Sequence, residues 1–201
     1  MSFNQQLILT IVDKLLIAAV IVLLGWILNR GVEKLKSELT IRNEFAKLRD
    51  AKRLEFLDKQ LSQFYYPLYI RLHIDGVVWR RILDKRSGED ELRRKVGDAI
   101  ERNTILPNHD EMVKIIQSNI HLAEGDGRAF DQMLKFVRHV AVYRAMREAG
   151  FHDKDPIALG EPWPDQLLPI IEKTTYELQR QYDDLTAKYL DLVSNEHKAD
   201  Q

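Results

Sequence analysis

The side chains with the clearest capacity for chemistry fall on two predicted helices in the middle of the chain. His109 and Glu111 lie at the start of the first helix, and His139, Tyr143 and Arg144 lie on the second. His139 and Tyr143 share a helical face, and His109 comes near them if the two helices pack antiparallel. Imidazole and carboxylate groups in one pocket could bind a ligand or exchange protons with a substrate. These five residues therefore form a candidate pocket.

Each polar member of this pocket also has a structural explanation. Asn108 can accept a hydrogen bond from the backbone of Glu111 while Glu111 reaches back, which is the pattern of a helix start. A metal site can be drawn from His109, Glu111 and His139, but a histidine on an apolar helix is usually a core residue. The chain has no cysteine, no phosphate-binding glycine loop and no Gly-x-Ser-x-Gly motif. The sequence therefore predicts no catalytic residue, no metal and no cofactor.

A membrane-spanning helix is predicted at the N-terminus. Residues 7–28 read LILTIVDKLLIAAVIVLLGWIL and contain only two charges. At about 1.5 Å per residue, such a helix spans about 33 Å, enough to cross a hydrocarbon core of about 30 Å. A buried helix of a soluble domain would accommodate the charges more easily, but it leaves the apolar run 15–28 without a polar face. A cleaved signal peptide is disfavoured, because no basic residue precedes the run and no small-residue cleavage site follows it.

Basic residues on one side of this segment predict its orientation. No Lys or Arg precedes it, whereas eight lie between residues 30 and 53. Because basic residues stay on the cytoplasmic side, we expect a short extracytoplasmic N-terminus (1–6), a transmembrane helix (7–28) and a cytoplasmic helical domain (29–201). The residues expected to contact lipid headgroups at the inner interface are Trp26, Arg30, Lys34 and Lys36.

Asp13 and Lys14 are the polar residues within the predicted span. A charge costs about 2.5–3.5 kcal/mol at the centre of a membrane helix on insertion scales. Both residues lie toward the outer end, and helical side chains lean toward the N-terminus, so both can reach the outer interface. In a second interpretation they pair with another span, in an oligomer or a pore.

The remainder of the chain has helical periodicity, and no convincing alternating strand occurs. We expect an all-α fold, in which the transmembrane helix continues into a cytoplasmic helical bundle with a long C-terminal helix. Pro67 should kink the first long helix or start a new one. Further helices are predicted over 69–83, 89–102, 108–124, 128–149 and about 165–193, with Gly150 closing the fourth of these. The proline-rich segment 151–164 is expected to be an ordered loop.

The last predicted helix carries a seam of apolar and aromatic residues at alternating steps of four and three. Its members are Ile171, Thr175, Leu178, Tyr182, Leu185, Tyr189 and Leu192. This spacing is typical of a coiled coil. We expect the seam to pack on the chain's own long first helix, because tyrosine is bulky for a two-stranded coiled coil. A contact between copies of the chain is the alternative.

Charge is distributed unevenly along the chain, although the formal net charge is only −1. Residues 30–102 hold 18 Lys and Arg against 13 Asp and Glu, whereas residues 103–201 hold 11 against 17. The basic half could lie against anionic headgroups, or the two halves could attract each other within one bundle. Tyr65, Tyr66 and Tyr69 lie near arginines and could stack bases. Low overall basicity favours lipid or packing roles over nucleic acid.

Three short stretches resemble landmarks of a loose group of uncharacterised bacterial single-span membrane-anchored helical proteins. They are Phe64-Tyr65-Tyr66-Pro67-Leu68, Ile105-Leu106-Pro107-Asn108-His109 with Glu111, and His139-Val140-Ala141-Val142-Tyr143. The resemblance covers most of residues 1–150. It implies a single-pass protein of the bacterial inner membrane with a cytoplasmic helical domain, and it implies no catalytic residue. Orphan anchored proteins of this kind are sometimes accessories of defence or mobile-element modules.

Two functional hypotheses follow from these observations. The first is a non-enzymatic membrane-anchored interaction protein, which forms a homo-oligomer or recruits a membrane or cytoplasmic protein, or acts as a membrane effector. The second is a ligand sensor or enzyme that uses the pocket of His109, Glu111, His139, Tyr143 and Arg144. The second requires those side chains to converge and to point inward.

Overall fold

The computed structural model describes the backbone of residues 3–85, 90–124, 127–152 and 154–199, and the side chains of 23–84, 90–124, 127–152 and 154–190. All regular elements among these residues are helical, as the periodicity predicts, and no strand occurs among them. The chain divides into two compact units, residues 1–51 and 52–201.

The elements follow one another with few connecting residues. In chain order they are α1 (Phe3–Gln60), η1 (Leu61–Tyr65), α2 (Tyr66–Arg81), η2 (Leu83–Lys85), α3 (Glu91–Ile100), η3 (Glu101–Ile105), α4 (Leu106–Asn119), η4 (Ile120–Leu122), α5 (Gly127–Glu148), η5 (Pro156–Leu159) and α6 (Leu167–Ala199). Of the η elements, η1 and η3 are π-helical turns, and η2, η4 and η5 are 3₁₀ turns.

The first unit consists of α1, which continues into the second unit. No proline occurs before Pro67, so nothing in this stretch interrupts a helix. Side chains from Leu23 to Ala46 are all exposed. Where side chains are described, no helix is both long enough and apolar enough to cross a membrane. Most of the predicted span 7–28, with Asp13 and Lys14, lies outside the described side chains.

A π-helical turn precedes Pro67 and lets the helix continue through it. In η1, the N–H of Tyr66 donates to the carbonyl of Leu61, five residues earlier. Proline has no N–H, so it cannot supply the donor that an α-helix would give to the carbonyl of Gln63. Asn119 Nδ2 donates to that oxygen at 3.2 Å instead. The chain therefore stays helical from α1 through η1 into α2, which starts at Tyr66 with Pro67 in its first turn.

The same arrangement occurs at Pro107, and it makes one sequence prediction wrong. No helix begins at Asn108, because α3, η3 and α4 follow one another without a break from Glu91 to Asn119. The N-cap is Asp90, whose side chain accepts from the backbone N–H of Leu92 at 3.0 Å. The π-helical turn η3 lets the helix continue past Pro107, so Asn108 and Glu111 lie inside the helix and do not cap it.

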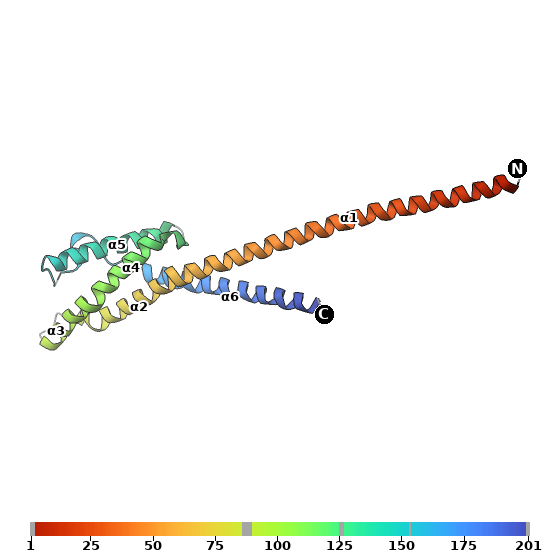
Figure 1. Ribbon diagram of the computed structural model, residues 1–201. Coiled ribbons are helices and arrows are strands. Elements are labelled where there is room, and N and C mark those ends of the chain that lie inside the picture. The colour runs from red at the N-terminus through yellow and green to blue at the C-terminus, as the bar shows by residue number, and fades with distance from the viewer. Residues whose placement is uncertain (1–2, 86–89, 125–126, 153, 200–201) are drawn as a thin grey trace. The chain divides into compact units, whose positions relative to one another are not determined.

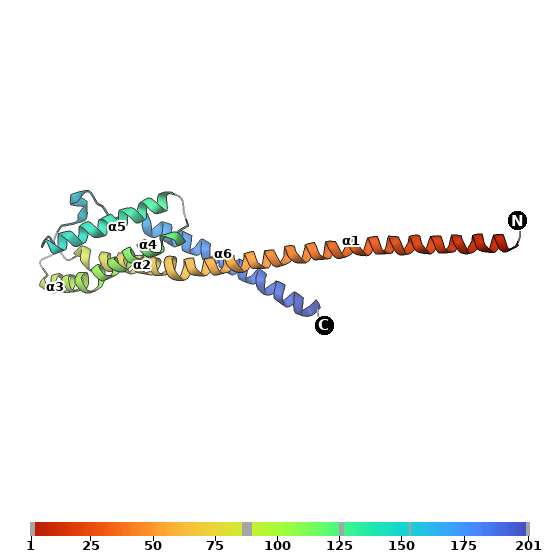
Figure 2. The ribbon, with the colours of Figure 1, turned by 45° about the horizontal axis from the view of Figure 1, so that its top comes forward.

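In the second unit, α2 lies beside α4 and α6, and α5 also lies beside α4 and α6 (Figures 1 and 2). The buried core comes from these helices together with η1 and the last turn of α1. Its largest apolar members are Leu57, Leu61, Phe64, Tyr65, Leu68, Leu72, Met112, Ile116, Met133, Phe136, Leu167, Ile171 and Leu178. Along the first long helix, apolar side chains are buried only from Leu57 onward, because Leu48 and Ala51 are exposed and Leu54 is half-buried.

In the second unit, Gly150 closes the fourth predicted helix as expected, whereas the seam of the last helix packs within the chain but mainly on elements other than the predicted long first helix. Gly150 ends α5 with a φ of 83°, and the N–H of Phe151 donates to the carbonyl of Met146 at 2.9 Å. The seam on α6 packs within the chain as far as Leu185, mainly on η1, α2 and α5. Tyr189 is exposed, and Leu192 lies outside the described side chains.

Candidate functional site

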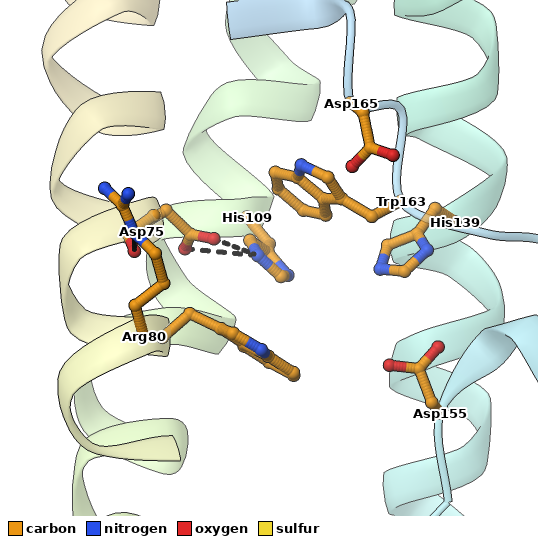
Figure 3. A pocket seen from close by; sticks show the side chains of 9 residues that line it. Asp75, Arg80, His109, His139, Asp155, Trp163 and Asp165 are labelled. Atoms are coloured by element: carbon orange, nitrogen blue, oxygen red, sulfur yellow. Dashed lines mark hydrogen bonds and ion pairs between the residues drawn. The ribbon is translucent and has the colours of Figure 1, made fainter. Parts of the chain in front are cut away.

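A pocket of about 330 Å³ opens in the second unit, between α2, α4, α5 and the loop that precedes α6. Figure 3 shows His109, His139 and Asp155 around a common open space, whereas the guanidinium of Arg80 lies back along α2. The lining residues are Asp75, Gly76, Trp79 and Arg80 on α2, His109 on α4, His139 on α5, and Asp155, Trp163 and Asp165 on the loop. This volume lies at the lower end of the range for small-molecule sites.

The deepest polar group in this pocket is the pair formed by Asp75 and His109. Asp75 is 2% exposed and His109 is 1% exposed. The carboxylate of Asp75 lies 3.2 Å from His109 Nε2, and Asn108 Nδ2 donates to the same carboxylate at 3.4 Å. A carboxylate only accepts, so Nε2 carries the proton of the neutral imidazole. His109 Nδ1 then presents a lone pair, and no described residue forms a hydrogen bond with it.

Asn108 fixes the position of this pair through bonds to α2. Its Nδ2 donates to the carbonyl of Arg71 at 3.0 Å, and its Oδ1 accepts from Arg71 Nη1 at 3.1 Å. Asn108 and His109 are consecutive on α4, and they bond to Arg71 and Asp75, which lie one turn apart on α2. This arrangement orients the ring of His109 before any ligand is present.

His139 faces the same space from α5. Its Nδ1 lies 2.8 Å from the carbonyl oxygen of Glu161, which can only accept, so Nδ1 carries the proton. Burial is the largest effect on the pKa of His139 and lowers it, against the opposing effect of the hydrogen bond to the carbonyl of Glu161. The ring is therefore neutral near pH 7, and its Nε2 is a hydrogen-bond acceptor.

Aromatic side chains pack around the two histidines. The indole of Trp163 has its ring centre 5.8 Å from that of His109 and 5.2 Å from that of His139. Tyr143 stacks on His139, with ring centres 6.1 Å apart, and meets His109 edge-on at 5.5 Å. Trp79 contacts Tyr143 at 6.1 Å. The site is thus two hydrogen-bonded imidazoles within an aromatic shell.

Of the five residues predicted to form a pocket, the structure brings three together. His109 and His139 line the pocket, and Tyr143 packs against both rings. Glu111 and Arg144 do not belong to the pocket. Glu111 lies near Lys114 on the surface, with Oε1 3.7 Å from Nζ, and Arg144 forms an exposed ion pair with Asp110. Both predictions are wrong because these side chains leave their helices on other faces.

Near the predicted membrane interface, the exposed residues Trp26 and Arg30 contact each other. The guanidinium carbon of Arg30 lies 5.0 Å from the centre of the Trp26 indole ring. Lys34 and Lys36 are also exposed. These residues are accessible for the headgroup contacts predicted from the sequence.

Sequence reasoning missed Asp75, Trp79, Asp155 and Trp163. Asp75 carries a detectable signal, because it falls on the helical face marked by the apolar residues Leu68, Leu72 and Trp79 at steps of four, three and four. The acid on the loop and the two indoles give no such signal, since only the tertiary fold brings them to the histidines. Among the described residues, no group of three or more His, Cys, Asp or Glu side chains is placed to hold a metal ion.

Comparisons with known proteins found no match to this chain among family models, curated proteins or solved structures. The arrangement of the pocket is therefore the basis for the functional argument. Chemically, it can accept hydrogen bonds from a ligand and enclose an apolar or planar body.

The lowered pKa of His139 predicts a pH dependence of stability. Unfolded chains bind the His139 proton near pH 6.5, whereas the folded protein binds it only at lower pH. The free energy of unfolding should thus fall as the pH drops below about 6.5, by at most about 1.4 kcal/mol per pH unit from this group. Urea unfolding of the full chain in detergent, at several pH values, should show a weaker dependence for His139→Gln. The exposed His121→Gln should match the wild type, and an unchanged dependence in His139→Gln would contradict this assignment.

Proposed function

We propose that this chain is a membrane-anchored ligand-binding protein, in which one N-terminal span holds a helical domain at the cytoplasmic face. The observation that carries the ligand-binding part is the buried ring of His109, whose Nε2 is held by Asp75 while Nδ1 has no partner among the residues that the structure describes. An unsatisfied buried polar atom costs about 1–3 kcal/mol, which a bound ligand would recover. The histidines and aspartates of the lining could also exchange protons with a substrate, but we propose binding, because it requires only the unsatisfied Nδ1 and the open space beside it.

Anchoring in the membrane is supported by the apolar run 7–28 and by the exposure of its last residues. Leu23, Leu24, Trp26, Ile27 and Leu28 are each more than half exposed, on all sides of α1. Exposure of five large apolar side chains in six positions to water is unfavourable, and burial in lipid would remove this cost. The basic residues that follow place the domain in the cytoplasm.

The anchoring proposal predicts the outcome of an alkaline carbonate wash. The wild-type chain should stay in the membrane pellet. Ile17→Arg combined with Val20→Arg should release it, because each arginine costs about 2.5–3.5 kcal/mol near the centre of a span. Leu39→Arg, which lies beyond the predicted span, should stay in the pellet. A wild-type chain that appears in the wash would remove the basis for the anchor.

The ligand-binding proposal predicts stabilisation by cellular small molecules. The dialysable fraction of a bacterial lysate should raise the Tm of the detergent-solubilised full chain, since a ligand at about 100 times its Kd contributes about 2.7 kcal/mol. Gly76→Leu should abolish the rise, because the position lines the pocket and has open space around it. Gly31→Leu on α1 is the matched control and should keep it. Equal shifts in the wild type and Gly76→Leu would contradict ligand binding in this pocket.

Self-association through α1 is a second candidate, and a specific observation favours it. Leu28, Val32, Leu35 and Leu39 follow one another at steps of four, three and four, and all are exposed. This is the spacing by which helices pair in a coiled coil. Leu28 is 68% exposed, which leaves most of its surface available to a second copy.

Cysteine crosslinking can test this self-association directly, because the chain contains no native cysteine. Val32→Cys lies within the apolar stripe and should give a disulfide-linked dimer in oxidised membranes. Lys34→Cys lies about 200° around the helix from Val32, so it should crosslink several-fold less. Equal crosslinking at both positions would indicate random collision rather than a defined interface.

A further inference from the structure

The hydrogen-bonding groups inside the pocket specify what a ligand must carry. This inference rests on the proposed ligand-binding function. His109 Nδ1 has no hydrogen-bond partner among the described residues, and it is an acceptor when the ring carries a single proton, on the Nε2 that faces Asp75. His139 Nε2 is an acceptor because Nδ1 already donates to the carbonyl of Glu161. Two inward lone pairs are satisfied only by hydrogen-bond donors. A ligand that presents N–H groups fits this requirement, whereas one with only acceptors leaves both nitrogens unsatisfied.

The charges around the pocket indicate the sign of the ligand's charge. Asp155 and Asp165 are exposed at the rim of the pocket, whereas Asp75 is buried and bonded to His109. Figure 3 shows the carboxylate of Asp155 on the His139 side of the opening. Within the described lining the cationic side chain is Arg80, which is exposed and whose Nε donates to the carbonyl of Gly76 at 3.0 Å. Acidic groups outnumber it, so a cation is attracted and an anion is repelled.

The walls and the volume indicate an organic cation rather than a metal ion. Trp79 and Trp163 line the pocket, and an indole face attracts ammonium and guanidinium groups. A volume of about 330 Å³ far exceeds what a bare ion occupies. Hydrogen-bonded imidazoles are also common around metals. However, no third protein ligand among the described residues completes such a site.

We propose that the pocket binds a small organic cation that carries N–H donors, of the primary amine or guanidinium class. Its donors bond His109 Nδ1 and His139 Nε2, its charge is balanced by the carboxylates at the rim, and its body lies against the indoles of Trp79 and Trp163.

Isothermal titration of the full chain in detergent with matched probes tests this assignment. Tryptamine and agmatine supply the amine and guanidinium groups. Tryptophol replaces the amine of tryptamine by a neutral hydroxyl, and indole-3-propionate replaces it by a carboxylate. At least one of the two cations should bind saturably, and tryptamine should bind at least about tenfold more tightly than tryptophol, a difference of about 1.4 kcal/mol. Indole-3-propionate should not bind.

Rim variants locate the bound cation. Asp155→Asn and Asp165→Asn keep the size of each side chain, and the first of these also keeps the side-chain oxygen that accepts from the N–H of Ile157. Each should weaken cation binding by about tenfold, as expected when a charge-assisted bond is lost. Asp184→Asn, on the exposed surface of α6, should leave binding unchanged. Gly76→Leu should abolish binding by filling the pocket.

The outcomes separate this inference from the ligand-binding proposal. Preferred binding of tryptophol or indole-3-propionate, or saturable binding of Zn²⁺ that Gly76→Leu abolishes, would overturn the cation assignment and leave a ligand-binding pocket. If neither cation binds while the dialysable lysate fraction still stabilises the chain, the cation assignment is overturned and the ligand-binding proposal stands. Failure of every probe and of the lysate fraction would overturn both proposals.

Discussion

Asp75 is a carboxylate in the interior of a helical bundle, and its need for hydrogen bonds organises the site. A buried carboxyl group needs hydrogen-bond partners that replace the water that it has lost. Those partners are Asn108 and His109, two consecutive residues of α4. The requirement of one acid on α2 therefore fixes how α4 lies against α2. It also leaves one ring nitrogen of His109 for the pocket.

Two prolines preceded by π-helical turns make this contact possible. A π-helical turn holds one residue more than an α-helical turn, so it rotates everything that follows relative to an unbroken α-helix. In both η1 and η3, the turn ends two residues before the proline. The rotation at η3 directs Asn108 and His109 toward α2. The sequence alone does not reveal this turn, and residues 104–111 therefore match the pattern of a helix that starts with Asn108 as its cap.

Periodicity is sufficient to predict that the chain is helical and where α5 ends, because apolar spacing and Gly150 act locally, but it does not predict that α3, η3 and α4 run on without a break. It also predicted that His109, His139 and Tyr143 would meet, since this required only that two neighbouring helices pack together. Glu111 and Arg144 were assigned wrongly because closeness in sequence is not closeness on a helix. Glu111 lies about 200° around α4 from His109, and Arg144 lies about 100° around α5 from Tyr143. The loop residues Asp155 and Trp163 could not be predicted, because no local pattern fixes where a loop packs.

The wall of the pocket behind the histidines is connected to the loop that carries Asp155. Tyr143 touches both imidazoles, and its hydroxyl donates to the buried carboxylate of Glu101, which also accepts from Arg147 Nε at 2.7 Å. Burial and the bond to Glu101 raise the pKa of Tyr143 well above its usual value, so the phenol keeps its proton.

Arg147 extends this connection from the helix to the loop. Its Nη1 donates to the carbonyl of Phe151 at 2.6 Å and to that of Lys154 at 2.8 Å, next to Asp155. Its guanidinium also lies 4.2 Å from the centre of the Tyr143 ring. The buried guanidinium of Arg147 thus holds both the ring of Tyr143, which packs against the two histidines, and the loop that carries Asp155. A ligand that contacts His139 and Asp155 meets groups already positioned relative to each other, so little conformational entropy is lost when it binds.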